Sequence, residues 1–134
     1  MTKKIKIAVS VVVLVFLLLA VGVIPTGKVK THSNYYSDRE INSAIFMAKL
    51  YFTLNFKGCD LIDIDYAGDE SIPAAKEWAE DSSAKKAIIL TSSFKTDSNR
   101  GDGSFSPNKT YKDWQWIMIS HLGLIYHHKT HGYG

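Results

Sequence analysis

A run of 21 residues without a charged side chain, from Ile7 to Gly27, constrains this chain more than any other feature of its sequence. Val, Leu and Ile dominate the run, and a helix of about 20 such residues crosses the hydrocarbon core of a bilayer. A cleaved signal peptide is the alternative, because Ala20-Val21-Gly22 offers small residues at which an apolar region could end. We therefore expect residues 1–27 to be an N-terminal membrane anchor or a signal peptide, with residues 7–27 in contact with the membrane.

The lysines around this segment predict its orientation. Lys3, Lys4 and Lys6 precede the segment, and Lys28 and Lys30 follow it. Positive residues are enriched on the cytoplasmic side of membrane segments. We expect a single-pass protein of the cell membrane with its domain on the extracytoplasmic side, or a secreted domain if the segment is cleaved.

The rest of the chain has room for one small domain. Residues 28–35 form a polar tether, and residues 36–134 leave roughly 100 residues for a single core. Without the three lysines before the apolar run, 13 basic residues balance 13 acidic ones, and they form no basic cluster. A neutral domain lacks the charge pattern that binds phosphate backbones, so we expect no nucleic-acid partner. The single cysteine, Cys59, excludes an internal disulfide.

The first helix of the domain is predicted by its start signal and by its apolar spacing. Ser37-Asp38-Arg39-Glu40 fits a capping box, with Tyr36 before the cap and Ile41 after it as a hydrophobic staple. The apolar residues that follow recur at helical spacing: Ile41, Ala44, Ile45, Ala48, Tyr51 and Phe52. We expect this helix to end near residues 55–58 and to lie on a sheet.

Four strands and a second helix complete the prediction. Residues 59–66 alternate, which puts Ile62, Ile64 and Tyr66 on one face and Leu61, Asp63 and Asp65 on the other. A short helix is predicted over residues 71–80, and the remaining strands over residues 87–95, 111–120 and 124–133, the last of them polar enough for an edge or an open concavity. This order predicts an α+β domain in which two helices pack on one face of a four-stranded antiparallel sheet.

The connection between the second and third strands is the first candidate site. It runs from Thr96 to Asn108, far longer than a hairpin needs, and such loops are often functional. Its candidate ligand-binding residues carry oxygen or cationic groups: Asp97, Asn99, Arg100, Asp102, Ser104 and Asn108. The spacing is not that of an EF-hand, because Asn108 stands where the last ligand should be Glu.

Two tryptophans extend this candidate site. Trp114 and Trp116 recur at strand spacing with Met118, so their side chains share one face. Such a row is typical of a core. On a concave face it would instead form a stacking platform for a sugar or a peptide, and we include both tryptophans among the candidate ligand-binding residues.

Catalytic and metal-binding patterns are weak. The sequence has no nucleophile elbow, phosphate-binding loop or dinucleotide fingerprint. Asp63 and Asp65 share a strand face at about 6 to 7 Å, a spacing compatible with acid–base work. In a strand, His127 and His131 lie about 13 Å apart and His128 points to the opposite face, which does not suit one ion. We therefore assign no catalytic residues, no metal ligands and no cofactor.

Several segments resemble a group of small uncharacterised envelope proteins of Gram-positive bacteria. The segments that carry the resemblance are Tyr36-Ser37-x-x-Glu40-Ile41, Phe56-Lys57-Gly58-Cys59, Ser92-Ser93-Phe94, Gly101-Asp102-Gly103-Ser104, Pro107-Asn108-x-Thr110-Tyr111, Trp114-x-Trp116-Ile117 and Gly132-Tyr133-Gly134. The resemblance implies a secreted or anchored domain with a cystatin-like or nuclear-transport-factor-like roll. His131 departs from the group, which has tryptophan there, and the apolar segment lacks a lipid-attachment cysteine.

Together these features predict a non-enzymatic, membrane-anchored extracytoplasmic domain that binds an envelope protein, a peptide or a cell-wall ligand. The alternative is a small cell-envelope hydrolase or transferase that uses the Asp63/Asp65 face or a histidine.

Overall fold

The computed structural model of the chain describes residues 10–13, 29–98, 105–123 and 125–133. Residues 10–13 are helical, and the remainder of the predicted 7–27 membrane segment lies outside the described residues. Within the described ranges, no helix has the length and apolar character needed to cross a bilayer.

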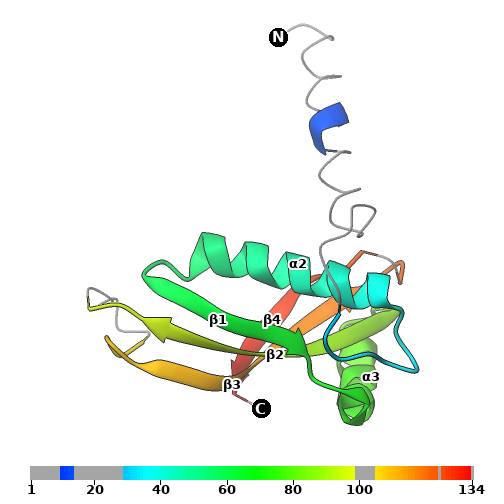
Figure 1. The fold of residues 1–134 in the computed structure, drawn as a ribbon. Coiled ribbons are helices and arrows are strands. Elements are labelled where there is room, and N and C mark those ends of the chain that lie inside the picture. Colours follow the sequence, from blue (N-terminus) through cyan, green and yellow to red (C-terminus); the bar gives the residue numbers. More distant parts are fainter. Residues whose placement is uncertain (1–9, 14–28, 99–104, 124, 134) are drawn as a thin grey trace, which may run out of the picture.

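The domain is an antiparallel sheet with helices packed against it (Figure 1). Along the chain the elements are α2 (Asp38–Asn55), β1 (Cys59–Tyr66), the 3-10 turn η1 (Asp69–Ser71), α3 (Ile72–Asp81), β2 (Lys86–Thr96), β3 (Thr110–Ser120) and β4 (His127–Tyr133). The strands lie in the order β1-β2-β3-β4, and each pairs with its sequence neighbour. The predicted α+β class with four antiparallel strands is confirmed, and β1 and β4 are the edge strands.

The two long helices lie on opposite faces of the sheet, so the prediction that both cover one face is wrong. Ile88 and Leu90 of β2 pack in the cluster that contains the buried side of α2. Ala87 and Ile89 of the same strand pack instead with Ala75 of α3. Because β2 is apolar on both sides where it begins, each side needs a cover, and one helix supplies each cover.

The N-terminus of α2 forms as its sequence predicts. The Ser37 side chain accepts a hydrogen bond from the Glu40 backbone, and the Glu40 carboxylate accepts one from the Ser37 N–H at 2.8 Å. Tyr36 and Ile41 on either side of the cap are both buried in the α2 side of the core. Capping box and staple together fix where the helix begins and how the chain enters it.

A bulge in β1 overturns the predicted assignment of its faces. The pairing of β1 with β2 shifts register between Leu61 and Asp63. Leu61 consequently packs against the same core cluster as Ile64 and Tyr66, while the Ile62 side chain is 54% exposed. Strict alternation places Ile62 on the face of Ile64 and Tyr66, and Leu61 on the opposite face. The extra residue of the bulge turns Leu61 toward the core and Ile62 toward solvent.

Strand β4 begins at His127, three residues later than predicted. The preceding Tyr126 side chain is fully buried, and its hydroxyl donates to the Glu40 carboxylate of α2 at 3.1 Å. Gly123 in the connecting turn has a φ of 81°, a conformation that favours glycine. The chain therefore reaches toward α2 before it joins the sheet as an edge strand.

Candidate functional site

The predicted tryptophan platform is not an open surface. Trp116 has no exposed surface, and its indole N–H donates to the Ser92 hydroxyl at 2.8 Å. Trp114 is half-buried, and its indole nitrogen is buried with no hydrogen-bond partner among the described residues. A ligand could reach only part of Trp114, while Trp116 belongs to the core.

The described ends of the β2–β3 loop are held by the backbone. The Asp97 N–H donates to the Gly58 carbonyl at 2.9 Å, and the Asn108 N–H donates to the Asp97 carbonyl at 3.2 Å. The Thr96 hydroxyl donates to the Ser106 carbonyl at 2.6 Å and accepts from the Lys109 N–H at 3.0 Å. Asp97 and Asn108 thus lie together at the base of the loop. The other candidate residues, Asn99, Arg100, Asp102 and Ser104, lie outside the described residues.

Phe105 ties the far limb of this loop to the core. Its ring centroid lies 5.4 Å from that of Phe94 and 5.7 Å from that of Trp114. Aromatic contacts of this kind stabilise a fold beyond the area they bury. The part of the loop that carries Phe105 therefore packs against the core at this end of the sheet.

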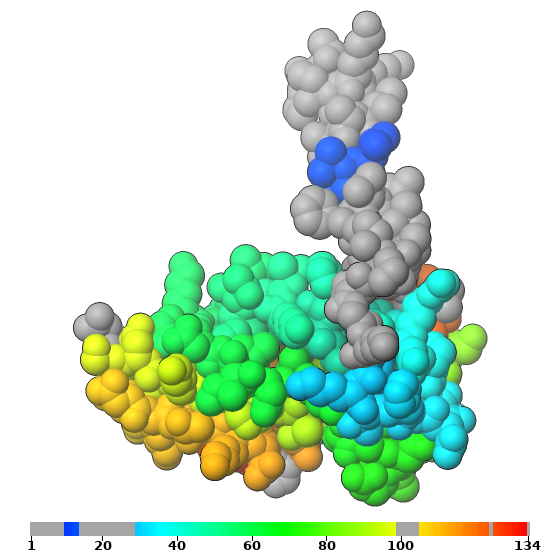
Figure 2. Space-filling model, in the orientation of Figure 1, coloured from blue at the N-terminus to red at the C-terminus, as the bar shows by residue number. Residues whose placement is uncertain are grey.

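A groove between α2 and β1 is one of several concave surfaces among the described residues. It encloses about 330 Å³. Residues of the tether, α2 and β1 line it: Val29, Lys30, Asn42, Ile45, Phe46, Lys49, Leu61, Ile62, Asp63, Ile64 and Asp65. Figure 2 shows α2 (teal) and β1 (green) side by side on this surface. The lining combines apolar side chains with lysines and aspartates, a composition suited to a peptide with both kinds of residue.

The tether closes one end of the groove because Asp65 holds it against β1. The Thr31 hydroxyl donates to the Asp65 carboxylate at 2.6 Å, and the Tyr66 N–H donates to the same carboxylate at 2.7 Å. Val29, two residues earlier, is only 7% exposed and packs in the core. Asp65 is therefore a structural residue of the groove, whereas Asp63 is exposed.

The sequence did not predict the groove, because Val29 and Lys30 were assigned to a polar tether and Ile62 to the same strand face as Ile64 and Tyr66. One signal was available. Phe46 stands outside the apolar stripe predicted for the helix, and a large apolar residue in that position suggests a second contact surface.

The histidines form a pair that the strand pattern did not predict. The pairing of β3 with β4 shifts register between Ile117 and Met118. This bulge brings His128 and His131 to one face, with the His128 Nε2 2.9 Å from the His131 Nδ1, so the prediction that they point to opposite faces is wrong. The Tyr51 ring stacks on His128 at 3.8 Å between centroids.

Neutral imidazoles suit this site. Burial, together with the nearby His131 and His127, lowers the pKa of His128 to about 4. Burial also lowers the pKa of His131. An unfolded histidine titrates near 6.5. Between these pH values the unfolded chain binds more protons than the folded one, so folding becomes less stable as the pH falls.

Acidification from pH 7 to pH 5 should therefore lower the free energy of unfolding of the parent by about 1 to 2 kcal/mol more than that of a His128→Phe variant. Phenylalanine keeps an aromatic ring under Tyr51 but has no proton to bind. Urea unfolding at the two pH values measures the difference. His121→Phe is the matched control, because His121 is exposed in the β3–β4 connection. Equal pH dependence in the parent and the His128→Phe variant would show that folding does not keep this partly buried pair neutral.

The two sets of residues proposed for catalysis do not converge. Asp63 and Asp65 lie on β1, while the histidine pair lies on β4 at the other edge of the sheet. Three strand spacings separate these edges, roughly 14 Å. In the described part of the chain, no three His, Cys, Asp or Glu side chains are placed to hold a metal ion.

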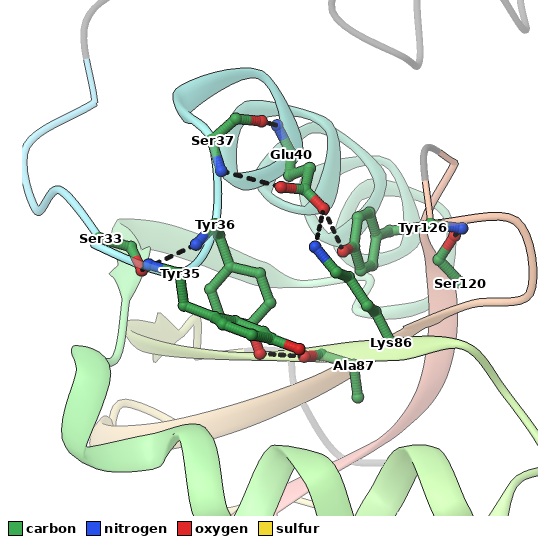
Figure 3. A network of polar contacts seen from close by, with 10 residues as sticks. Ser33, Tyr35, Tyr36, Ser37, Glu40, Lys86, Ala87, Ser120 and Tyr126 are labelled. Carbon is green, nitrogen blue, oxygen red and sulfur yellow. Dashed lines mark hydrogen bonds and ion pairs between the residues drawn. The ribbon is translucent and has the colours of Figure 1, made fainter.

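A polar network around Glu40 joins three parts of the domain (Figure 3). Besides capping α2, the Glu40 carboxylate accepts from the Lys86 ammonium at 3.0 Å and from the Tyr126 hydroxyl at 3.1 Å. The Tyr36 hydroxyl donates nearby to the Ala87 carbonyl. Burial raises the pKa of Glu40, but the hydrogen bonds from Ser37 and Lys86 outweigh it and hold that pKa below its usual range. The network is a structural lock between α2, β2 and the β3–β4 connection.

No family model, curated protein or solved structure matches the chain. The resemblance to envelope proteins of Gram-positive bacteria therefore stays a prediction. Function is inferred from the geometry of the groove and of the edge strand beside it.

Proposed function

We propose that this chain is a membrane-anchored extracytoplasmic binding domain, without enzymatic activity, that takes an extended peptide segment of an envelope protein along β1. The observation that carries the proposal is an edge strand bordered by a groove, with the Ile62 side chain 54% exposed beside it. The peptide adds a fifth strand to the sheet, and its alternate side chains enter the groove.

The backbone of β1 supplies the affinity in this proposal. Only β2 pairs with β1 among the described residues, so the outer backbone groups of an eight-residue strand have no strand neighbour. An added strand would hydrogen-bond to these groups in register. Apolar side chains of the peptide would cover Ile62 and the α2 side of the groove.

The charges of β1 select the partner. Asp60 and Asp63 are exposed on this strand, while Asp65 is engaged by Thr31 and the Tyr66 N–H. Like charges that meet across a strand pair are destabilising, so these aspartates oppose pairing of β1 with another copy of itself. A peptide that alternates basic and apolar residues meets the aspartates with opposite charge.

The anchor in this proposal is the uncharged segment of residues 7–27. Its length matches a bilayer, and the lysines before it favour a cytoplasmic N-terminus. The domain would then present β1 to partners outside the cell. The hydrolase or transferase alternative has less support, since Asp65 is engaged by the tether and the histidines lie at the far edge.

A short synthetic peptide tests the binding. The probe is a fluorescent peptide of alternating lysine and valine, and fluorescence anisotropy follows its binding to the full chain in detergent micelles. We expect Ile62→Asn to weaken binding about tenfold, equivalent to about 1.4 kcal/mol, because the groove loses its exposed apolar contact. Leu122→Asn is the control, since Leu122 is 69% exposed in the β3–β4 connection, away from the groove.

A second probe separates strand addition from simple charge attraction. The same peptide with N-methyl groups on alternate residues keeps its charge but cannot donate the hydrogen bonds of a strand. The proposal predicts that it binds at least tenfold more weakly. Equal binding of the two peptides, or of the parent and the Ile62→Asn variant, contradicts it.

A further inference from the structure

Helix α2 has a second apolar stripe on the side that faces away from the sheet. Its buried residues are Ile41, Ala44, Ala48 and Phe52, which pack in the core, and Ser43, which lies three residues before Phe46. Phe46, Leu50 and Leu54 recur at intervals of four residues on the other side. Leu50 is 41% exposed and Leu54 is 62% exposed. A helix of a globular domain normally carries polar residues on that side, so this stripe calls for a partner.

The residues around the stripe are basic. Lys49 and Lys57 are both exposed next to it. The acidic residues of α2, Asp38 and Glu40, are confined to its first turn. The C-terminal half of α2 and the turn after it thus combine exposed leucines with Lys49 and Lys57, a composition typical of a helix that lies in the interface of a membrane.

The length of chain before the domain determines how far a membrane can be from this helix. The uncharged segment ends at Gly27, and Val29 is already buried in the core and lines the groove beside α2. Only residue 28 lies between them. Two residue steps span at most about 7 Å. A bilayer that holds residues 7–27 therefore ends within about 7 Å of Val29, which lies beside α2.

We propose that the outer side of α2 lies on the surface of the same bilayer that holds the anchor, with Leu50 and Leu54 in the headgroup layer and Lys49 and Lys57 at lipid phosphates. This inference rests on the anchor of the proposed function. Figure 1 shows α2 lying along one side of the sheet with α3 on the other, so docking turns α3 away from the membrane.

Because the connection between the anchor and the domain is short, weak contacts are enough to hold α2 on the membrane. Two partly exposed leucines and two lysines would bind a bilayer only weakly from solution. The anchor keeps the helix at the surface, which converts binding into an intramolecular step at high effective concentration. Docking fixes the orientation of the domain, and β1 then lies at the membrane surface beside α2.

Fluorescence quenching by lipids tests the docking. The full chain, in a Cys59→Ser background, carries a bimane label on Thr53→Cys, next to the stripe, or on Glu77→Cys of α3; both positions are exposed. Each protein is placed as one copy per nanodisc of phosphatidylcholine and phosphatidylglycerol with nitroxide-labelled lipid. We expect quenching of the Thr53 label at least threefold stronger than that of the Glu77 label, and loss of at least half of it in a Leu50→Ser, Leu54→Ser variant.

The outcomes separate docking from anchoring. A chain that resists carbonate extraction from membranes but shows equal quenching at Thr53 and Glu77 is anchored without docking, and overturns this inference alone. A chain that carbonate releases has no spanning anchor, which overturns both proposals. If the Thr53 label is shielded only when each nanodisc holds two copies, a second copy covers the stripe instead of lipid, and docking is again overturned.

Discussion

Replacing Trp116 with alanine is expected to lower the free energy of unfolding by about 4 kcal/mol, the largest effect of any single substitution considered for this domain. The Trp116 side chain is fully buried between α2 and the sheet, with the Phe56 ring centroid 5.3 Å from its own. Alanine leaves a cavity there, and Ser92 loses the indole N–H that it accepts. Since a domain of this size is stable by about 5 to 15 kcal/mol, the variant should be close to unfolding at 37 °C.

Two matched variants make this expectation specific. Trp116→Phe keeps an aromatic ring but loses the indole N–H, so it should cost about half as much. Trp78→Ala removes a half-buried tryptophan on α3 and should cost less than Trp116→Ala. Urea unfolding followed by circular dichroism measures all three. If Trp116→Ala is as stable as the parent, Trp116 is not a core residue, and a ligand platform at this position regains support.

Replacing Glu40 with alanine is expected to lower the free energy of unfolding by about 3 kcal/mol. The Glu40 side chain is 12% exposed and the Lys86 side chain 25% exposed, so the ion pair between them is largely shielded from water. Removing one partner of a buried pair leaves the other charge uncompensated. This costs more free energy than the intact pair contributes to stability. The variant also loses the second half of the capping box.

The control for this variant is the other acidic residue in the same turn. Asp38→Ala removes a side chain that is 59% exposed and should cost about 0.5 kcal/mol or less. Glu40→Gln retains a carbonyl oxygen for Ser37 and Tyr126, so its cost should lie between those of the two alanine variants. Equal stability of Glu40→Ala and Asp38→Ala would mean that the network in Figure 3 does not lock the domain.

Local sequence signals predicted those parts of the fold that depend on local interactions. The capping box at Ser37 and Glu40 needs only four consecutive residues, and it was found from them. The four strands were found because their apolar runs are long and end at turn residues. Lys86 and Tyr126 lie 46 and 86 residues from Glu40, and no local pattern links them to it.

The errors came from bulges and from the placement of the helices. One extra residue in β1 and another in β4 reversed the predicted directions of Ile62 and His128. Sequence alternation cannot locate such residues, because a bulge is decided by packing across the sheet. The opposite placement of α2 and α3 could have been predicted, since β2 and β3 are apolar on both faces and each face needs a cover.

The candidate site was predicted only in part. The β2–β3 loop drew attention by its length, and the structure brings Asp97 and Asn108 together at its base. The groove combines Val29, α2 and β1, segments that are distant in sequence. The groove could not be predicted without knowing that Val29 is buried, and the composition of the tether does not show this.

Amide hydrogen exchange on β1 tests the central claim most directly. The Cys59 and Tyr66 N–H groups donate to the Phe56 carbonyl and the Asp65 carboxylate. Between these two residues, amides of β1 that point away from β2 have no strand partner among the described residues and should exchange quickly in the free protein. Adding the alternating lysine–valine peptide to the full chain in micelles should slow exchange along β1 at least tenfold and leave β4 unchanged. If exchange along β1 stays the same at saturating peptide, or slows instead at the β2–β3 loop, the peptide does not add to this edge and the proposed binding mode is wrong.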